Sequence, residues 1–422
     1  MRRLYTLLLY LALPFVSLIV LLRGLRNRDY WRGWGERFGF GAQPLPGGLW
    51  VHAVSVGEVQ AAALLIEALQ ARPPASAITL SCATPTARAR ALALLPGVDV
   101  RYAPYDLPGS VRRCFARLAP RMLIVLETEL WPNLLHEAQR CGVPVLIASA
   151  RVSARSARIY QHLPGLLRAA LAANAWVGAQ TEVDAQRFAA LGVPPERLWV
   201  VGNIKFDRAP PPGQFERGAQ LRTRYASGRA VWAAGSTHPG EEQIVLEAHR
   251  LLLGQLPQAL LILAPRHPQR FDAAAASVAA HGFACMRRSG GASEANCQVL
   301  LLDTLGELAD FYAAADVAFV GGSLVPIGGH NLLEPAALGL PVLSGPQHFS
   351  SPEVARALGE RGALTIVHDA AELAAALTGL LADREARAQQ GAAGRAAIDA
   401  NRGALARLLG LIDHLPPRRH AA

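Results

Sequence analysis

Leu49-Trp-Val-His-Ala-Val-Ser-Val-Gly-Glu58 is an apolar run that ends in a serine, a glycine and a carboxylate, and a helical stretch follows it to about Gln70. An apolar run of this length, closed by small and polar residues ahead of a helix, is typical of a buried β-strand that leads into a helix. We therefore expect a strand–turn–helix unit here, with Glu58 just beyond the carboxyl end of the strand.

The same pattern recurs through the first half of the chain. Further apolar runs lie at 78–82, 122–126, 143–148, 175–178 and 198–201. Short apolar strands separated by helices predict a parallel sheet that is covered on both faces. Gly202 to Gly228 breaks the rhythm with the run Pro210-Pro-Pro-Gly213, which is typical of a linker.

A second series of the same kind fills the other half. Its runs lie at 231–234, 260–264, 299–302, 317–320 and 341–344, and helices are expected to about Ile412. The length of 422 residues suits two or three domains. We expect two Rossmann-like α/β domains that face each other across a cleft, because ligands of open parallel sheets bind beyond the carboxyl ends of the strands.

The first thirty residues differ in kind from the rest. Leu4 to Leu22 is a stretch of 19 residues without a charge, and arginines flank it at positions 2, 3, 23, 26 and 28. That length is just enough to cross a bilayer, and arginines after a span favour a cytoplasmic location for the remainder of the chain. We expect a membrane anchor rather than a cleaved signal peptide, because no small-x-small site follows Leu22. A buried core helix is the other alternative, and the pattern leaves open whether an anchor spans the membrane or lies in it.

The charge distribution points to the same surface. The chain has 42 Lys and Arg against 32 Asp and Glu, a net +10, and residues 1–41 alone hold seven arginines against Asp29 and Glu36, a net +5. Aromatic residues alternate with these charges at Tyr30, Trp31, Trp34, Phe38 and Phe40. This concentration beside an apolar segment favours anionic lipid headgroups over nucleic acid, which we do not expect as a partner.

Carboxylates at strand ends are the candidates for acid–base chemistry. Gly57 permits a sharp turn that would present Glu58 in a partly apolar cleft, where desolvation makes a carboxylate a general base. The alternative is that Glu58 caps the first turn of its helix. Glu127 and Glu129 lie at the end of another strand, where they form either an ion pair or cap, or a pair of acids with Glu58 as in a glycosidase.

Lys205 is the one lysine among 42 basic residues, and it precedes the linker. A compact, flexible ammonium suits a phosphate or a developing negative charge better than a planar guanidinium does. A solvated surface lysine is the alternative.

The second half carries weak signals for a nucleotide. Gly235-Ser-Thr237 and Gly328-Gly-His-Asn331 are glycine loops that precede helices, whose free N–H groups attract anions. Arg266 is placed to pair with the same phosphate, Gly306-Glu-Leu308 to offer amides, and Glu334 to accept bonds from ribose hydroxyls. No P-loop occurs. No HExxH occurs and the five cysteines lie far apart without a CxxC pair, so we expect neither a metal site nor a disulfide scaffold.

Together these motifs resemble the 3-deoxy-D-manno-octulosonic acid (Kdo) transferases of Gram-negative bacteria. The resemblance rests on Trp50-Val-His-Ala-Val-Ser-Val-Gly-Glu58, Glu127-Thr-Glu-Leu-Trp-Pro-Asn133, Gly202-Asn-Ile-Lys-Phe-Asp207 and Gly328-Gly-His-Asn-Leu-Leu-Glu-Pro335, in that order along the chain. It implies a GT-B glycosyltransferase fold with an N-terminal membrane anchor helix at 1–26, an acceptor domain at 27–206 and a CMP-sugar-binding domain at 207–422. It also implies a location at the cytoplasmic side of the inner membrane, with a single-pass anchor.

The resemblance implies the reaction as well: Kdo passes from CMP-Kdo to a tetraacylated, bis-phosphorylated lipid A precursor with inversion, without a metal or other cofactor. The family's general base falls on Glu58, and its transition-state stabilisers fall on Glu127 and Lys205. Its CMP-binding residues fall on Pro265, Arg266, Gly306, Glu307, Leu308, Asn331, Leu332, Leu333 and Glu334. Ser149-Ala-Arg151 departs from the family's usual Asn-Ala-Arg, which puts acceptor contacts in doubt. A GT-B transferase with a UDP-sugar donor and a non-catalytic, membrane-tethered nucleotide sensor are the alternatives.

Overall fold

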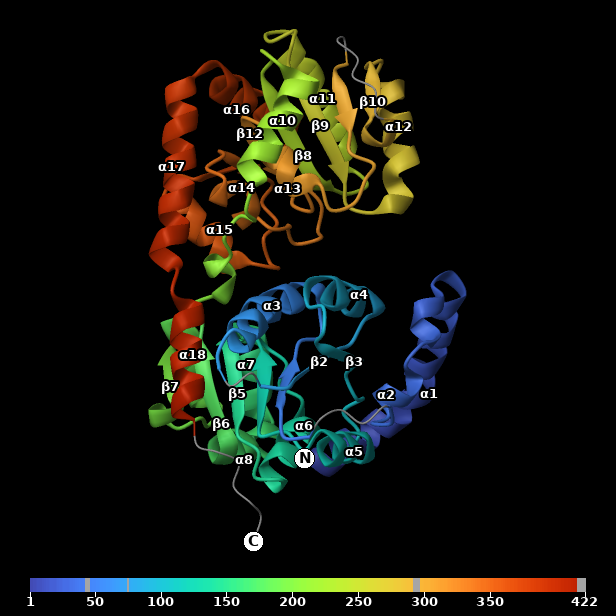
Figure 1. Ribbon diagram of the computed structural model, residues 1–422, viewed down its shortest axis with the longest axis vertical. Helices are drawn as coiled ribbons and strands as arrows, with labels where there is room; N and C mark the ends of the chain where they lie inside the picture. Colours follow the sequence, from blue (N-terminus) through green and yellow to red (C-terminus); the bar gives the residue numbers. More distant parts are fainter. Residues whose placement is uncertain (42–45, 74–75, 291–296, 416–422) are drawn as a thin grey trace. The chain divides into compact units, whose positions relative to one another are not determined.

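A computed structural model describes residues 1–41, 46–73, 76–290 and 297–415 of the chain (Figure 1). The chain forms two compact units. Unit 1 contains Met1–Asp207 together with the residues from Arg402 onward, and unit 2 contains Arg208–Asn401. Each unit holds one seven-stranded sheet in which every strand pair is parallel.

The sheet of unit 1 has the order β3-β2-β1-β4-β5-β6-β7. Its strands are β1 (Leu49–His52), β2 (Ile78–Cys82), β3 (Asp99–Tyr102), β4 (Met122–Leu126), β5 (Val145–Ala150), β6 (Ala175–Ala179) and β7 (Leu198–Val200). Its helices are α1 (Arg2–Arg26), α2 (Trp34–Arg37), α3 (Val56–Gln70), α4 (Pro85–Leu94), α5 (Pro108–Leu118), α6 (Pro132–Arg140), α7 (Ala154–His162), α8 (Pro164–Asn174), α9 (Glu182–Ala190) and α18 (Ala404–His414), with short 3-10 turns η1 (Arg28–Trp31), η2 (Pro195–Arg197) and η3 (Ile204–Asp207).

Both faces of this sheet are buried, because successive strand residues point to opposite sides. Leu49 and Val51 pack into one core with α3, α4 and α18, whereas Trp50 between them packs into a second core with α5, α6, α8 and α9. The expected parallel sheet with two covered faces is confirmed. The helices begin where local chemistry favours a start: prolines occupy the first turns of α4, α5, α6 and α8, and serine or threonine side chains cap α3, α4, α7 and α9.

Unit 2 repeats the design with the order β10-β11-β9-β8-β12-β13-β14. Its strands are β8 (Val231–Thr237), β9 (Leu260–Pro265), β10 (Cys285–Arg287), β11 (Val299–Leu301), β12 (Val317–Val320), β13 (Val342–Ser344) and β14 (Leu364–Ile366). Its helices are α10 (Gln214–Ala226), α11 (Glu241–Leu253), α12 (Phe271–Ala280), α13 (Leu308–Ala313), α14 (Leu333–Ala337), α15 (Pro352–Gly359), α16 (Ala370–Ala382) and α17 (Arg384–Asn401), with short turns η4 (Pro268–Arg270) and η5 (Arg288–Gly290).

Three strands were not expected from the sequence, and all three are edge strands. β3 lies at one edge of the sheet of unit 1, and β10 and β14 lie at the two edges of the sheet of unit 2. Each is only three or four residues long and half-buried in part, because an edge strand has one neighbour and partial cover. A short run with polar residues lacks the apolar signature by which central strands are found. The predicted linker is likewise partly helical, since α10 occupies Gln214–Ala226 and packs on α13.

The last helix belongs to unit 1, whereas the sequence placed everything from 207 onward in the C-terminal domain. The carboxylate of Asp207 accepts hydrogen bonds from the backbone N–H groups of Gly403 (2.5 Å) and Leu405 (2.6 Å), which lie at the start of α18. Leu408 is fully buried in a core of unit 1. Figure 1 shows α18, in red, beside the green strands of unit 1. The apolar period of a helix reveals that it covers a sheet and not which sheet it covers.

Helix α1 is the one described helix that is long and apolar enough to cross a membrane, with a mean hydropathy of 2.3 over Arg2–Leu25. The segment after it is not wholly at the surface, as the alternation of charges and aromatic residues suggested. Arg37 is 5% exposed, donates to the carbonyl oxygen of Ala83 and lies over the ring of Tyr102 at 4.0 Å. Arg28 and Arg32, by contrast, are exposed.

Candidate active site

Glu58 lies in the first turn of α3, directly after β1. Its backbone N–H donates to Ser55 Oγ, and its Oε2 accepts hydrogen bonds from the N–H groups of Val54 (2.7 Å) and Ser55 (3.1 Å). This is a complete capping box, so the capping role considered from the sequence is real. Both of these backbone hydrogen bonds go to Oε2 rather than to Oε1.

The environment of Glu58 also shifts its pKa. Burial and, to a smaller extent, the negative charges of Glu129 and Glu127 raise the pKa of its carboxyl, whereas the backbone hydrogen bonds lower it, and the net result is a pKa of about 7. A carboxylate whose pKa lies near neutrality is well matched to proton transfer at physiological pH. The capping role and the raised pKa therefore coexist in one side chain.

Glu127 follows β4 in a left-handed backbone conformation, with φ of 54°. Its N–H donates to Ala148 of the neighbouring strand, and its carbonyl oxygen accepts from Arg151. Its carboxylate is buried, contacts Lys205 Nζ at 2.6 Å and lies 3.9 Å from Arg151 Nη2. A non-glycine residue held in this conformation is strained, and such strain is common where a functional side chain must be aimed.

Lys205 is thus not a surface lysine. It lies on η3, where its N–H donates to Asn203 Oδ1 and the preceding N–H of Ile204 donates to Ser149 Oγ at the end of β5. Only 23% of its side chain is exposed. The structure therefore joins Glu127, Lys205 and Arg151 into one charged cluster at the carboxyl ends of β4, β5 and β7.

Glu129 does not pair with Glu127. Its Oε2 accepts a hydrogen bond of 2.6 Å from Trp131 Nε1, and burial raises the pKa of its carboxyl. The ring of Trp131 packs edge-on against His52 of β1 at 4.5 Å. His52 is completely buried, with Nδ1 2.9 Å from Ser81 Oγ, and burial lowers its pKa to about 3, so this imidazole stays neutral.

In unit 2, Glu241 holds two loops together. It is completely buried in the first turn of α11; its Oε2 accepts from the N–H groups of His238 (3.0 Å) and Gly322 (2.7 Å), and its Oε1 from Ser323 and Leu324 (2.9 Å each). One carboxylate therefore binds four backbone N–H groups and holds the loops after β8 and β12 next to each other. Within β8, a side chain at Gly235 would meet the hydroxyl of Tyr312 at 2.0 Å.

Two histidines face each other at these loops. His238 Nε2 and His330 Nε2 are 2.8 Å apart with nearly parallel rings, and His267 lies edge-on to His238. Burial and, to a smaller extent, the positive charge of Arg266 lower the pKa of His330 to about 4, and burial likewise lowers the pKa of His238. At neutral pH the pair is uncharged, with one ring donating to the other.

The residues expected to bind CMP follow β9, β11 and β12, at the carboxyl ends of parallel strands. Pro265 ends β9, and the N–H of Arg266 donates to Thr237 while its side chain is exposed. Gly306 has φ of 87° just before Glu307, whose carboxylate binds Arg288 Nη2 (2.7 Å) and the Thr304 hydroxyl. Burial raises the pKa of Glu307, but these bonds outweigh it and the net direction is downward.

The third of these segments opens α14. Asn331 Oδ1 accepts from the N–H of Leu333 at 3.1 Å, and Leu332 and Leu333 are buried. Glu334 is half-buried; burial and, to a smaller extent, the charge of Glu334 raise the pKa of the Tyr312 hydroxyl. Leu308 begins α13, the helix that carries Tyr312. Among the residues that the structure describes, no group of three His, Cys, Asp or Glu is arranged to bind a metal ion.

Comparison with known proteins identifies the family. The family model "3-Deoxy-D-manno-octulosonic-acid transferase (kdotransferase)" matches residues 32–208, and the model "Glycosyl transferases group 1" matches residues 237–397. A 3-deoxy-D-manno-octulosonic acid transferase of Haemophilus influenzae is 40% identical over 97% of this chain and 98% of its own, and one of Bordetella pertussis is 40% identical over 98% and 99%. The chain belongs to the Kdo transferase family.

The Kdo transferase family membership makes this chain a glycosyltransferase, which excludes the non-catalytic sensor considered from the sequence. Among solved structures, UDP-GlcNAc 2-epimerase from Neisseria meningitidis bound to UDP-GlcNAc superposes with a TM-score of 0.60 at 16% identity, covering 87% of this chain and 99% of that one. This likeness shows the fold, and the expected GT-B fold is confirmed.

The four segments that carried the family resemblance all lie at strand ends. Residues 50–58 run from β1 into α3, 127–133 follow β4, 202–207 follow β7 and 328–335 follow β12. The sequence did not show that three further residues of this Kdo transferase contact the predicted site residues or hold their loops: His52, Arg151 and Glu241. His52 was counted within an apolar strand, and Glu241 within a helix start. Only Glu241 had a usable signal, since it follows a glycine loop directly.

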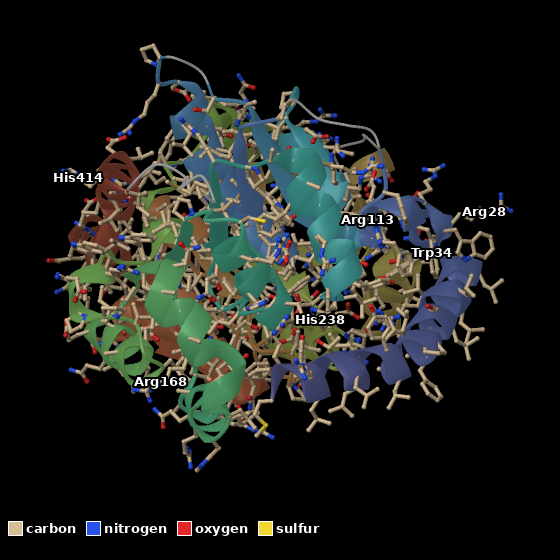
Figure 2. All side chains as sticks on the ribbon, turned by 90° about the horizontal axis from the view of Figure 1, so that it is seen from below. Arg28, Trp34, Arg113, Arg168, His238 and His414 are labelled. Carbon is tan, nitrogen blue, oxygen red and sulfur yellow. The ribbon has the colours of Figure 1, made fainter. Side chains whose placement is uncertain are left out.

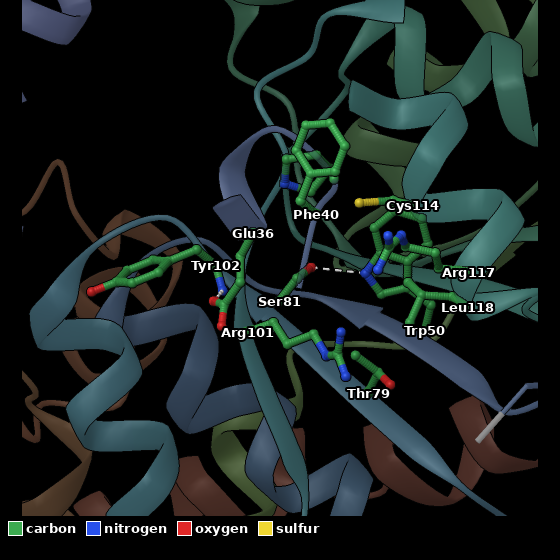
Figure 3. A pocket seen from close by; sticks show the side chains of 12 residues that line it. Glu36, Phe40, Trp50, Thr79, Ser81, Arg101, Tyr102, Cys114, Arg117 and Leu118 are labelled. Atoms are coloured by element: carbon green, nitrogen blue, oxygen red, sulfur yellow. Dashed lines mark hydrogen bonds between the residues drawn. The ribbon is translucent and has the colours of Figure 1, made fainter. Parts of the chain in front are cut away.

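Figure 3 shows a small cavity of about 20 Å³ in unit 1, which has room for about one water molecule. It is lined by Trp50, whose Nε1 donates to Ser81 Oγ, and by Arg101 and Glu36. None of the predicted site residues lines it.

Proposed function

We propose that this Kdo transferase moves Kdo from CMP-Kdo to a tetraacylated, bis-phosphorylated lipid A precursor, with inversion at the anomeric carbon. The proposal rests on Glu58, a buried carboxyl with a pKa of about 7. Its Oε2 accepts hydrogen bonds from backbone N–H groups, and these bonds also fix the orientation of Oε1. The family membership supports the sugar that is moved.

In the proposed reaction, Glu58 Oε1 takes the proton from a sugar hydroxyl of the acceptor. The oxygen of that hydroxyl forms a bond to the anomeric carbon of Kdo, while the bond between that carbon and the phosphate oxygen breaks. CMP leaves with the electron pair from the opposite face, so a single displacement inverts the configuration. The raised pKa keeps the carboxylate basic enough to accept the proton near pH 7.

Glu127 and Lys205 are proposed to stabilise the transition state. Their contact at 2.6 Å fixes the ammonium group in a buried site before substrate binds, which avoids reorganisation during the reaction. The ammonium would face negative charge that develops on the leaving phosphate. The carboxylate of Glu127 would offset positive charge that develops on the sugar ring.

The donor is proposed to bind on unit 2. Arg266 provides an exposed guanidinium for the single phosphate of CMP, and the amides of Gly306 to Leu308 and of Asn331 to Leu333 offer neutral donors. Pro265 fixes the strand end and Glu334 is placed to accept from ribose hydroxyls. The carboxylate of Glu241 keeps the loops after β8 and β12 in place for this task.

The enzyme is proposed to work at the cytoplasmic side of the inner membrane, held there by α1, because its acceptor is a membrane lipid. The exposed Arg28 and Arg32 beside α1 suit lipid phosphates. The UDP-sugar alternative has no observation in its favour beyond the fold.

The test is transfer in vitro with detergent-solubilised protein, CMP-Kdo and a tetraacyl lipid A precursor, read by mass spectrometry. We expect a Kdo mass increment that disappears in Glu58→Gln and persists in Glu67→Gln, an exposed carboxylate on the same helix. Transfer from a UDP-sugar, with none from CMP-Kdo, would overturn the donor. Undiminished transfer by Glu58→Gln would be compatible with the family assignment but would refute the role of Glu58 as the general base. The number of increments counts the Kdo residues added.

A further inference from the structure

The first turn of α1 is bound to the folded part of unit 1. The hydroxyl of Tyr5 donates to Asp106 Oδ2 at 2.9 Å. Arg2 Nη1 and the hydroxyl of Thr6 both lie within hydrogen-bond distance of Asn133 Oδ1, at 3.4 and 3.3 Å. Asp106 is 9% exposed and also accepts from the N–H groups at the start of α6. A polar anchorage of this kind fixes where the helix begins.

The other end of α1 is bound to the same unit. Trp31 of η1 folds back, covers Gly24 and donates from Nε1 to the carbonyl oxygen of Leu21 at 3.0 Å. The carbonyl oxygen of Asp29 accepts from the hydroxyl of Tyr102, in β3, at 3.2 Å. The last turn of α1 is therefore tied to the sheet through one short turn of chain.

The residues of α1 between these ends divide into two faces. The partly covered ones are Arg2, Tyr5, Thr6, Leu9, Leu13, Ser17, Val20 and Gly24, which fall on one stripe because they recur every three or four residues. This stripe carries Tyr5, Thr6 and Ser17, three of the helix's hydroxyl groups. The opposite face is apolar and exposed, with Leu11 at 61%, Phe15 at 71% and Leu18 at 54%. Figure 2 shows side chains of this helix pointing away from the rest of unit 1, with Arg28 and Trp34 near its far end.

A membrane-crossing orientation is incompatible with these contacts. At 1.5 Å per residue, the 25 residues of α1 are about 37 Å long, and a bilayer core is about 30 Å thick. A spanning helix would place its two ends on opposite sides of the membrane. Here both ends contact one folded unit, which lies on one side.

We propose that α1 lies in one leaflet, parallel to the membrane surface, with its exposed apolar face in the lipid and both ends on the side of the catalytic units. The arginines at both ends, Arg2 and Arg3 before the apolar stretch and Arg23 and Arg28 after it, suit an anionic surface at each end. This placement does not depend on which sugar the enzyme transfers.

The first test compares two leucines at similar depth in the helix but on opposite faces. Full-length Leu11→Asp and Leu13→Asp proteins are mixed with vesicles of phosphatidylethanolamine and phosphatidylglycerol, and the bound fraction is measured by flotation. We expect Leu11→Asp to weaken binding by about 100-fold, the size of the effect of an acidic residue in lipid, and Leu13→Asp to leave it nearly unchanged. A spanning helix is surrounded by lipid on all sides, so equal losses in the two variants would overturn the proposal.

The second test uses the unsubstituted chain. A short uncharged epitope tag is placed before Met1, and spheroplasts of a Gram-negative host that express the protein are treated with protease from outside. We expect the tag to survive until the inner membrane is permeabilised. Digestion of the tag in intact spheroplasts would overturn the proposal.

A Leu11→Asp protein that binds vesicles normally but loses self-association would also overturn the proposal, because the apolar face of α1 would then contact a second copy of the chain.

Discussion

The substitution Glu58→Gln is expected to remove activity and to stabilise the protein, in a manner that depends on pH. Glutamine can still accept the backbone hydrogen bonds of the capping box through its amide oxygen. It cannot take up a proton from the acceptor, so transfer is expected to fall by about 10²–10⁴-fold. A residue whose replacement stabilises the fold but abolishes the reaction contributes to activity at a cost in stability.

The magnitude follows from the raised pKa of Glu58. The native carboxyl has a pKa of about 7 against an ordinary value of 4.5, and at 1.36 kcal/mol for each pKa unit the difference corresponds to about 3 kcal/mol. Because the native pKa is the higher one, the protonated native state is favoured: this stabilisation is fully present below pH 4.5 and is lost as the pH rises through 7. Glutamine carries no charge at any pH, so Glu58→Gln is expected to equal the wild type near pH 4.5 and to exceed it by about 3 kcal/mol above pH 8.

The assay is thermal unfolding in detergent over pH 5–9, followed by tryptophan fluorescence. About 3 kcal/mol corresponds to an upper limit of roughly 6–12 °C in Tm for a unit of this size. Glu67→Gln is the control, because Glu67 is exposed on the same helix and no such trend is expected of it. A stability difference that does not change with pH, or a Glu58→Gln protein that is less stable at pH 8, would refute the reasoning that burial of this charge is costly.

Three further predictions concern the other clusters. Lys205→Met is expected to destabilise unit 1 by about 3 kcal/mol, because it leaves the buried carboxylate of Glu127 without its nearest partner. Adding Glu127→Gln to this variant is expected to restore stability but not activity. Denaturant unfolding of the single and double variants checks both expectations, and additive losses of stability would contradict the coupling of the two residues. Glu241→Gln is expected to weaken CMP binding at least tenfold in calorimetry, because an amide cannot accept all four backbone N–H groups, and unaltered binding would count against the loop role. Arg28→Gln with Arg32→Gln is expected to raise KM for the lipid acceptor and leave CMP affinity unchanged; an unchanged KM would remove these arginines from the acceptor site.

Much of the fold could be predicted because central strands of a parallel sheet are buried on both faces. The runs around β1, β4, β8 and β9 are almost wholly apolar, and each ends in a polar or glycine-containing loop. The edge strands β3, β10 and β14 escaped prediction because partial cover permits polar residues such as Asp99 and Arg101 within them. The assignment of α18 to unit 1 also escaped, since the bonds from Asp207 that cap it join residues almost 200 positions apart.

The site was predictable in its members and less so in its connections. Glu58, Glu127 and Lys205 were found because each follows a strand or departs from the composition of the chain. Nothing in the sequence showed that Lys205 contacts Glu127 rather than solvent, or that Glu129 binds Trp131 instead of pairing with Glu127. The contact between Lys205 and Glu127 is set by the sheet, whose neighbouring strand ends bring together residues 78 positions apart.

The sequence by itself determined the fold class, the family and the apolar N-terminal helix, because these depend on local periodicity and on short motifs. Only the tertiary structure decided that Glu58 is both a cap and a carboxyl with a raised pKa, because burial and the charges of Glu127 and Glu129 arise when distant segments meet. It likewise decided that both ends of α1 contact unit 1, through Asp106 and Tyr102. Periodicity reports how a segment is built, whereas solvation and charge depend on what surrounds it.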